Sequence, residues 1–113
     1  MEIRAETIDD NIRCISLDGR FDSEGSAAIE TKFAAYTSLD NGRVVIDLSD
    51  VIFLASIGIR TLIINTKSLQ KRGGKAALFG ATPEVERVLT MTGIHTLIPV
   101  CKDLAEAKAA VLA

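Results

Sequence analysis

The chain lacks most of the residues on which nucleic-acid binding, metal binding and disulfide formation depend. Its 113 residues include no Trp and a single Tyr, so the aromatic stacking surfaces of single-strand binders are missing. A net charge of −2 provides no positive field for a phosphate backbone, and we expect no nucleic-acid partner. Cys14 and Cys101 have neither metal-ligand nor CxxC spacing, so we expect reduced thiols and no metal site.

Long apolar runs are missing as well. No stretch approaches the roughly 20 apolar residues that cross a bilayer, and the opening MEIRAETIDD does not resemble a signal peptide. We therefore expect a cytoplasmic protein that does not insert into a membrane. Hydrophobic residues make up 48% of the chain and charged residues 25%, which is typical of globular proteins, and the length predicts one domain over residues 1–113.

What the chain does contain is a regular alternation of strand and helix patterns after an opening hairpin. In chain order we predict strands at 3–8 and 12–17, a helix capped by Asp22 or Ser23, an apolar strand from Val44, a helix up to Arg72, a strand at 75–80, a helix from Thr82-Pro83, a strand at 97–101 and a helix after Asp103. Gly19 is expected to end the second strand, and Asn41-Gly42 the first helix.

This order of elements predicts the fold class. Strands that alternate with helices form parallel sheets, and the opening hairpin adds one antiparallel pair. We therefore expect an α/β fold with a small mixed, mostly parallel β-sheet, an opening β-hairpin and about four flanking helices.

The segment Val44–Ile59, VVIDLSDVIFLASIGI, is the most informative part of the chain. An apolar strand leads through a short connection, in which Ser49 has turn chemistry, to Ser56 at the start of a helical pattern. A serine at such a junction meets free backbone N–H groups and the positive end of the helix dipole. Ser56 can therefore either cap the helix or carry a phosphate.

Three local patterns resemble the STAS domain of anti-sigma factor antagonists. They are Gly19-Arg20-Phe21-Asp22, the stretch from Asp47-Leu48-Ser49-Asp50 to Phe53-Leu54-Ala55-Ser56-Ile57-Gly58, and Met91-Thr92-Gly93-Ile94. No single pattern is specific, but their spacing and the order of elements extend the resemblance over nearly the whole chain. The chain is therefore identified as similar to STAS-domain antagonists, with a STAS-like fold.

The resemblance implies a protein-binding switch that is controlled by phosphorylation. In the family, an anti-sigma factor that is also a serine kinase, with ATP bound by that partner, phosphorylates the serine at the position of Ser56. A PP2C-type phosphatase removes the phosphate. The antagonist docks on the kinase when unphosphorylated and releases it when phosphorylated; it is not an enzyme and needs no cofactor.

The resemblance and the residue types together suggest roles around the serine. Asp22 matches an acidic residue near the phosphoserine, although it can also act only as a helix cap. Ile57, Gly58 and Arg60 are expected to help bind the partner; Gly58 would allow close backbone packing, and Ile57 can instead be a buried core residue. Ala55 departs from the family pattern, in which Asp commonly precedes the serine.

Two alternatives remain beside the switch, and a third is rejected. Ala55 favours a STAS scaffold subunit of a lipid or solute transport complex that is not phosphorylated. A receiver domain is rejected, because Asp47 lies within its strand without the acidic partners that grip a metal. A small enzyme is disfavoured, because the single histidine, His95, has no Ser or Cys placed beside it.

Overall fold

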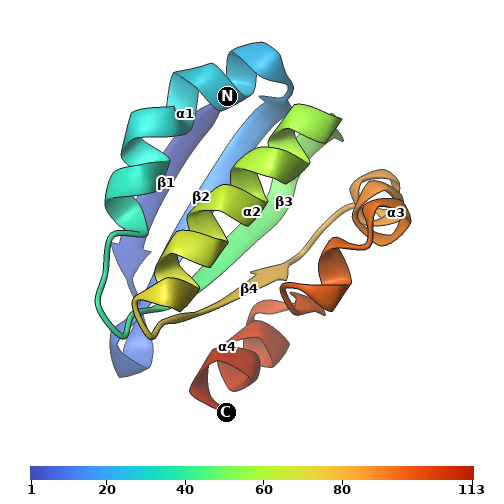
Figure 1. Cartoon of the computed structure of the whole chain (residues 1–113). Coiled ribbons are helices and arrows are strands. Elements are labelled where there is room, and N and C mark those ends of the chain that lie inside the picture. Colours follow the sequence, from blue (N-terminus) through green and yellow to red (C-terminus); the bar gives the residue numbers. More distant parts are fainter.

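The computed structural model describes the whole chain, residues 1–113, and contains one five-stranded sheet in the order β1-β2-β3-β4-β5. The elements are β1 (Glu2–Thr7), η1 (Asp9–Asn11), β2 (Ile12–Phe21), α1 (Ser23–Tyr36), β3 (Arg43–Leu54), α2 (Ser56–Lys71), β4 (Lys75–Phe79), α3 (Pro83–Thr92), η2 (Ile94–Thr96), β5 (Val100–Cys101) and α4 (Leu104–Leu112). Strands β1 and β2 are antiparallel, and β2 to β5 are parallel to one another. The predicted α/β fold, hairpin and four α-helices are confirmed (Figure 1).

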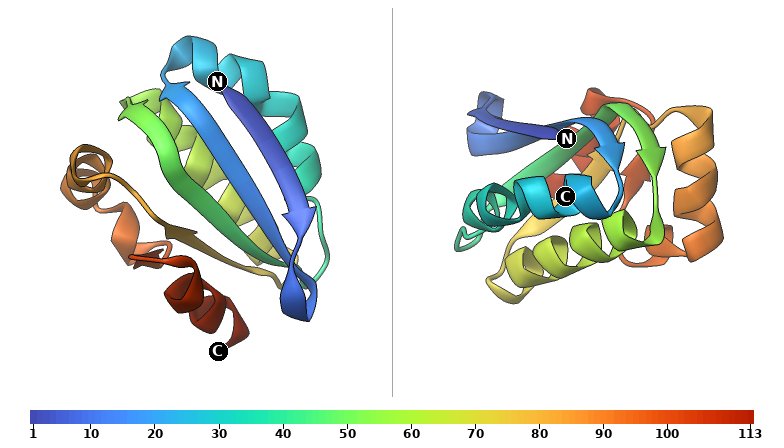
Figure 2. Two further views of the ribbon diagram at one scale, coloured as in Figure 1. Left: turned by 180° about the vertical axis from the view of Figure 1, so that it is seen from behind. Right: turned by 90° about the horizontal axis from the view of Figure 1, so that it is seen from above.

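The helices are divided between the two faces of the sheet. Helices α1 and α2 lie side by side on one face, and α4 packs against the other (Figures 1 and 2). Because side chains alternate along a strand, Val44 and Ile46 of β3 enter a core of 20 buried residues with α1, α2 and α3. Val45 points the other way, into a core of eight buried residues that includes Val111 of α4.

Strands β2 and β3 are longer than the sequence predicts. Gly19 does not end β2; at φ 117° it lies at a register shift, and the strand continues to Phe21. Strand β3 continues to Leu54, so Ser49 lies within a strand and not in a turn. Each extension is held by the other, since Phe21 pairs with Leu54. Turn-forming residue types are thus overridden by strand pairing.

The ends of α3 follow the local sequence closely, whereas the end of α1 and the length of the last strand differ from the prediction. Thr82 caps α3 before Pro83, and Gly93 ends it in the left-handed conformation, as predicted. Helix α1 ends earlier than expected, at Tyr36 rather than at Asn41-Gly42. The last strand is only two residues long. None of the helices combines the length and the apolar character needed to cross a membrane.

Gly58 lets the first turn of α2 lie directly against the end of β2. An added Cβ at this buried position would be 2.8 Å from the Phe21 carbonyl oxygen and 2.8 Å from Cδ1 of Leu54. The backbone oxygen cannot move aside without disturbing the strand. The close packing expected at Gly58 is therefore confirmed, and it offsets the cost of a glycine in a helix.

We predict that Gly58→Ala lowers the free energy of unfolding by about 1–3 kcal/mol, because overpacking outweighs the better helix propensity of alanine. Urea denaturation of the wild type and the variant measures this difference. Ser68→Ala, at an exposed position of the same helix, is the control and should not destabilise. A Gly58→Ala variant as stable as wild type would show that α2 does not depend on this close approach.

Candidate functional site

The candidate site lies where β2 and β3 end side by side. The two strands are parallel, and their last residues, Phe21 and Leu54, are register partners. The Ala55 amide donates a hydrogen bond of 3.0 Å to the Phe21 carbonyl oxygen and extends this pairing by one residue. Asp22 directly follows Phe21, and Ser56 directly follows Ala55. Both residues therefore lie at one edge of the sheet, at the starts of α1 and α2.

Ser56 is the first residue of α2 and does not cap it. The N-cap position is Ala55, whose side chain makes no capping hydrogen bond. This corrects the alternative in which Ser56 is the cap: the helix begins one residue earlier than that role requires. The Ser56 side chain is exposed, and the amides of Ser56 and Ile57 donate to no carbonyl of the chain. The hydroxyl is therefore accessible beside unused donors.

Helix α2 differs from the other three α-helices at its N-terminus. Each of the other three has a capping side chain and at least one acidic residue in its first turn; the caps are Asp22, Thr82 and Asp103. Helix α2 has neither. Its positive dipole end is thus left uncompensated next to Ser56, where negative charge is stabilised.

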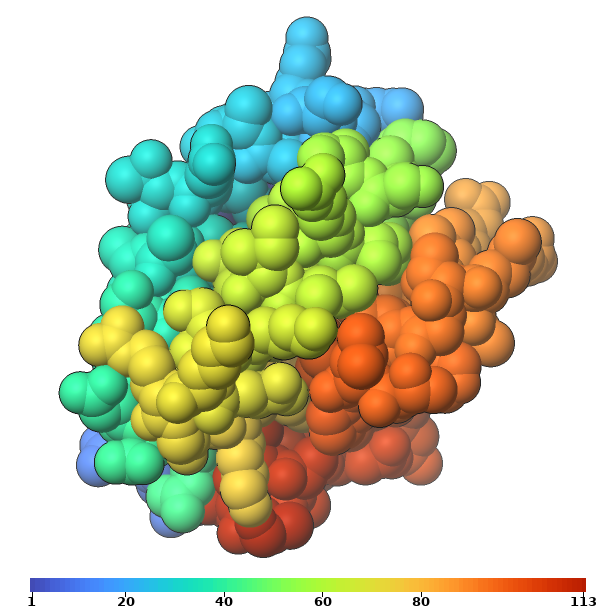
Figure 3. Space-filling model, viewed as in Figure 1, coloured from blue at the N-terminus to red at the C-terminus, as the bar shows by residue number.

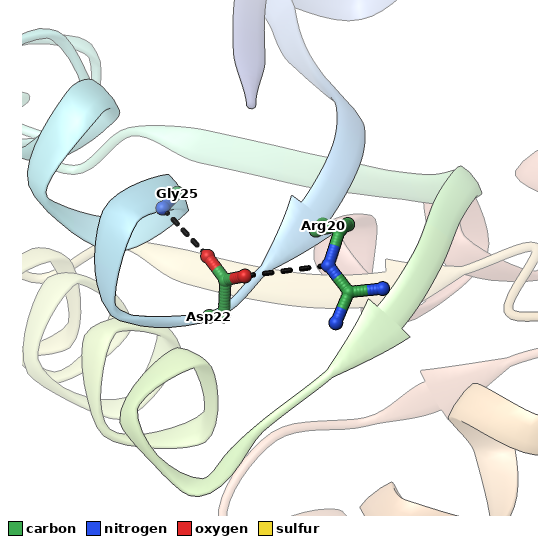
Figure 4. A network of polar contacts seen from close by, with 3 residues as sticks. All are labelled: Arg20, Asp22 and Gly25. Atoms are coloured by element: carbon green, nitrogen blue, oxygen red, sulfur yellow. Dashed lines mark hydrogen bonds and ion pairs between the residues drawn. The ribbon is translucent and has the colours of Figure 1, made fainter.

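Asp22 caps helix α1. Its carboxylate accepts a 2.9 Å hydrogen bond from the Gly25 amide and a 3.4 Å contact from Arg20 Nε (Figure 4). The Gly25 hydrogen bond is the largest cause that lowers the pKa of Asp22 below its ordinary value of 3.8. Desolvation opposes it, and the contact with Arg20 lowers the pKa further. Of the two residues considered for capping α1, Asp22 is the cap.

The remaining expected site residues lie on α2. Ile57 is 36% exposed and is therefore not a core residue, and Arg60 is exposed one helical turn beyond Ser56. Gly58 is buried beneath them and positions this surface without forming it. The structure thus brings Ser56, Ile57 and Arg60 together on the outer side of one helix, with Asp22 at the neighbouring helix start.

Sequence reasoning missed the end of β3 as part of this region. Ile52 and Phe53 are exposed apolar side chains only a few residues before Ser56. The Arg20 guanidinium lies over the Phe53 ring, 4.4 Å from its centroid, in a cation–π contact. The run of four apolar residues at the end of the strand, Val51–Leu54, is the signal that could have identified this surface.

Comparisons with known proteins agree on one family. The STAS domain model matches residues 2–107. The anti-sigma factor antagonist BtrV of Bordetella bronchiseptica is 28% identical over 101 residues, 89% of this chain and 87% of that protein. An anti-sigma factor antagonist of Mycobacterium paratuberculosis has 28% identity and a TM-score of 0.86 over 99% of this chain and 94% of its own. The STAS domain of a SulP transporter from Vibrio cholerae has 30% identity and a TM-score of 0.69 over 86% and 77%.

We predict that Asp22→Ala lowers the melting temperature at neutral pH by a few degrees, through loss of the α1 cap. Because the folded state depresses the pKa of Asp22, its contribution is present above pH 3.8 and is lost as the pH falls through the folded-state value. Thermal melts from pH 7 down to pH 2.5 should therefore show wild type and variant converging. Asp22→Asn is the control, since it keeps a capping oxygen without a titrating group. A constant difference across the range would show that the carboxylate charge is irrelevant.

We predict that Ala55→Asp raises the free energy of unfolding by about 0.5–2 kcal/mol, because it supplies the cap that α2 lacks. The backbone of Ala55 already has the extended conformation of an N-cap, with φ −96° and ψ 168°. Chemical denaturation measures the gain. Ala55→Asn separates capping from charge, since it keeps the first and omits the second. Loss of stability in both variants would refute an open cap position.

Proposed function

The chain belongs to the STAS domain family, and on that premise we propose that it is an anti-sigma factor antagonist switched by phosphorylation of Ser56. Its partner is an anti-sigma factor that is also a serine kinase and binds the ATP. A PP2C-type phosphatase restores the unmodified form. The chain itself catalyses nothing and acts by binding.

The observation that carries this proposal is the state of Ser56. Its hydroxyl is exposed, it does not cap α2, and α2 is the α-helix whose first turn has neither a capping side chain nor an acidic residue. A phosphate placed there meets free amides and the positive end of the helix dipole. The position therefore suits a phosphate, and the fold does not depend on an unmodified serine there.

The switch follows from electrostatics and needs no large movement. A phosphoserine carries about −1.5 to −2 charges at neutral pH. The helix terminus stabilises that charge, so the fold persists, whereas a partner surface packed over Ser56, Ile57 and Arg60 would bring its own acidic groups against the phosphate. Like charges across an interface cost several kcal/mol, enough to prevent docking. Asp22, at the neighbouring helix start, keeps its own negative charge in the same region.

A scaffold subunit of a transport complex is the second candidate function, and two observations favour it. Ala55 stands where phosphorylated relatives commonly carry Asp. The similarity to the STAS domain of a SulP transporter covers 86% of the chain. In this function the same fold serves as a fixed docking module, and Ser56 carries no phosphate.

We predict that Ser56 alone accepts phosphate from the cognate kinase and ATP. Intact-mass measurement should show one phosphate on wild type and none on Ser56→Ala. Ser49→Ala is a matched control, because the Ser49 hydroxyl is already held 2.7 Å from Asp47 Oδ1; it should be phosphorylated like wild type. Equal phosphate uptake by wild type and Ser56→Ala would refute the assignment.

A charge mimic tests the second half of the same prediction. Ser56→Glu should weaken binding to the kinase roughly tenfold or more while leaving the melting temperature nearly unchanged, since an acidic residue is favourable at a helix start. Calorimetric titration and a thermal melt measure the two effects, with Ser68→Glu on the same helix as control. Wild-type affinity in Ser56→Glu would favour the scaffold function instead.

A further inference from the structure

An open groove runs between α1 and α2, on the face of the molecule shown in Figure 3. Its volume is about 510 Å³. It begins beside Ser56, because Ile57, the next residue of α2, is part of its wall. The groove is therefore continuous with the surface on which the proposed switch acts.

The two walls of the groove have the same repeat along their helices. On α1 the wall includes Ala27 and Ala34, and on α2 it includes Ile57 and Ile64. Each pair is seven residues apart, or two helical turns. Small side chains on one wall leave room for a closely approaching backbone, and Ile64 on the other is 56% exposed. A stripe of this spacing is complementary to the apolar face of a third helix.

Three polar side chains of the groove have no partner in the free chain. Glu30 on α1 and Arg60 on α2 line opposite walls, and none of the three ion pairs in the structure involves either of them. The hydroxyl of Ser26, a 7% exposed wall residue, has no hydrogen-bond partner. The side chains of Glu30 and Arg60 are both exposed, so a docked segment with matching charges can pair with them. The opposite charges of the two walls also fix the direction in which such a segment lies.

We propose that this groove seats an amphipathic helix of the anti-sigma factor, with apolar residues seven positions apart and an acidic residue against Arg60. The inference rests on the proposed function and adds the part of the partner that is recognised. It also gives the phosphate a second effect. Arg60 lies four residues after Ser56 on the same helix, so a phosphate on Ser56 competes for this cation with the acidic residue of the docked helix.

Glutamate substitutions on both walls test the groove. Ile64→Glu and Ala34→Glu place a charge in the apolar stripe at exposed positions, where they should not prevent folding. The test uses a purified anti-sigma factor that binds wild type. Each variant should bind it with an affinity at least tenfold lower in calorimetric titration. The matched controls are Met91→Glu on α3, 79% exposed, and Ala35→Glu beside the groove on α1; both should stay within twofold of wild type.

The possible failures have different signatures. If wild type binds and both groove variants bind as tightly, the groove is not the docking site, while the proposed function stands. If wild type binds no anti-sigma factor, the proposed function fails and this inference fails with it. If sedimentation shows that wild type is a dimer and Ile64→Glu a monomer, the occupant is a second copy of the chain, which overturns the assignment to a partner.

Discussion

The parallel pairing of β2 with β3 at their carboxyl ends is the constraint on which the candidate site depends. The register that matches Phe21 with Leu54 brings the starts of α1 and α2 to one edge of the sheet. Gly58 then allows α2 to approach the Phe21 carbonyl closely enough to complete this arrangement. Asp22 and Ser56, 34 residues apart in sequence, become neighbours because two strands end together.

The sequence predicted the architecture well wherever one local signal dominated. The hairpin, the order of strands and helices, and the caps at Asp22, Thr82 and Asp103 depend on short-range chemistry that tertiary contacts did not override. The lengths of β2 and β3 were not predictable in this way. Their last residues, including Gly19 and Ser49, are strand residues only because each strand is the other's partner, and pairing of this kind is not encoded locally.

The sequence indicated which residues belong to the candidate site, but not the exact position of the helix cap or the groove beside it. The sequence indicated Ser56, Asp22, Ile57 and Arg60, yet the assignment of Ser56 as a possible cap was wrong by one residue, because Ala55 occupies that position. The groove between the helices was not foreseen. Its walls come from α1 and α2, and only their packing shows that Ile57 and Ile64 face an unoccupied space instead of the core.

The uncapped start of α2 has a consequence for the lifetime of the protein in the cell. Every other α-helix of the chain has its first turn stabilised by its own residues, so α2 is the helix whose start gains most from an added negative group. Under the proposed switch, a chain bearing phosphate at Ser56 would thus unfold slightly less often than the unmodified chain. Since proteases act on the unfolded fraction, the released form would persist longer than the form that is free to dock.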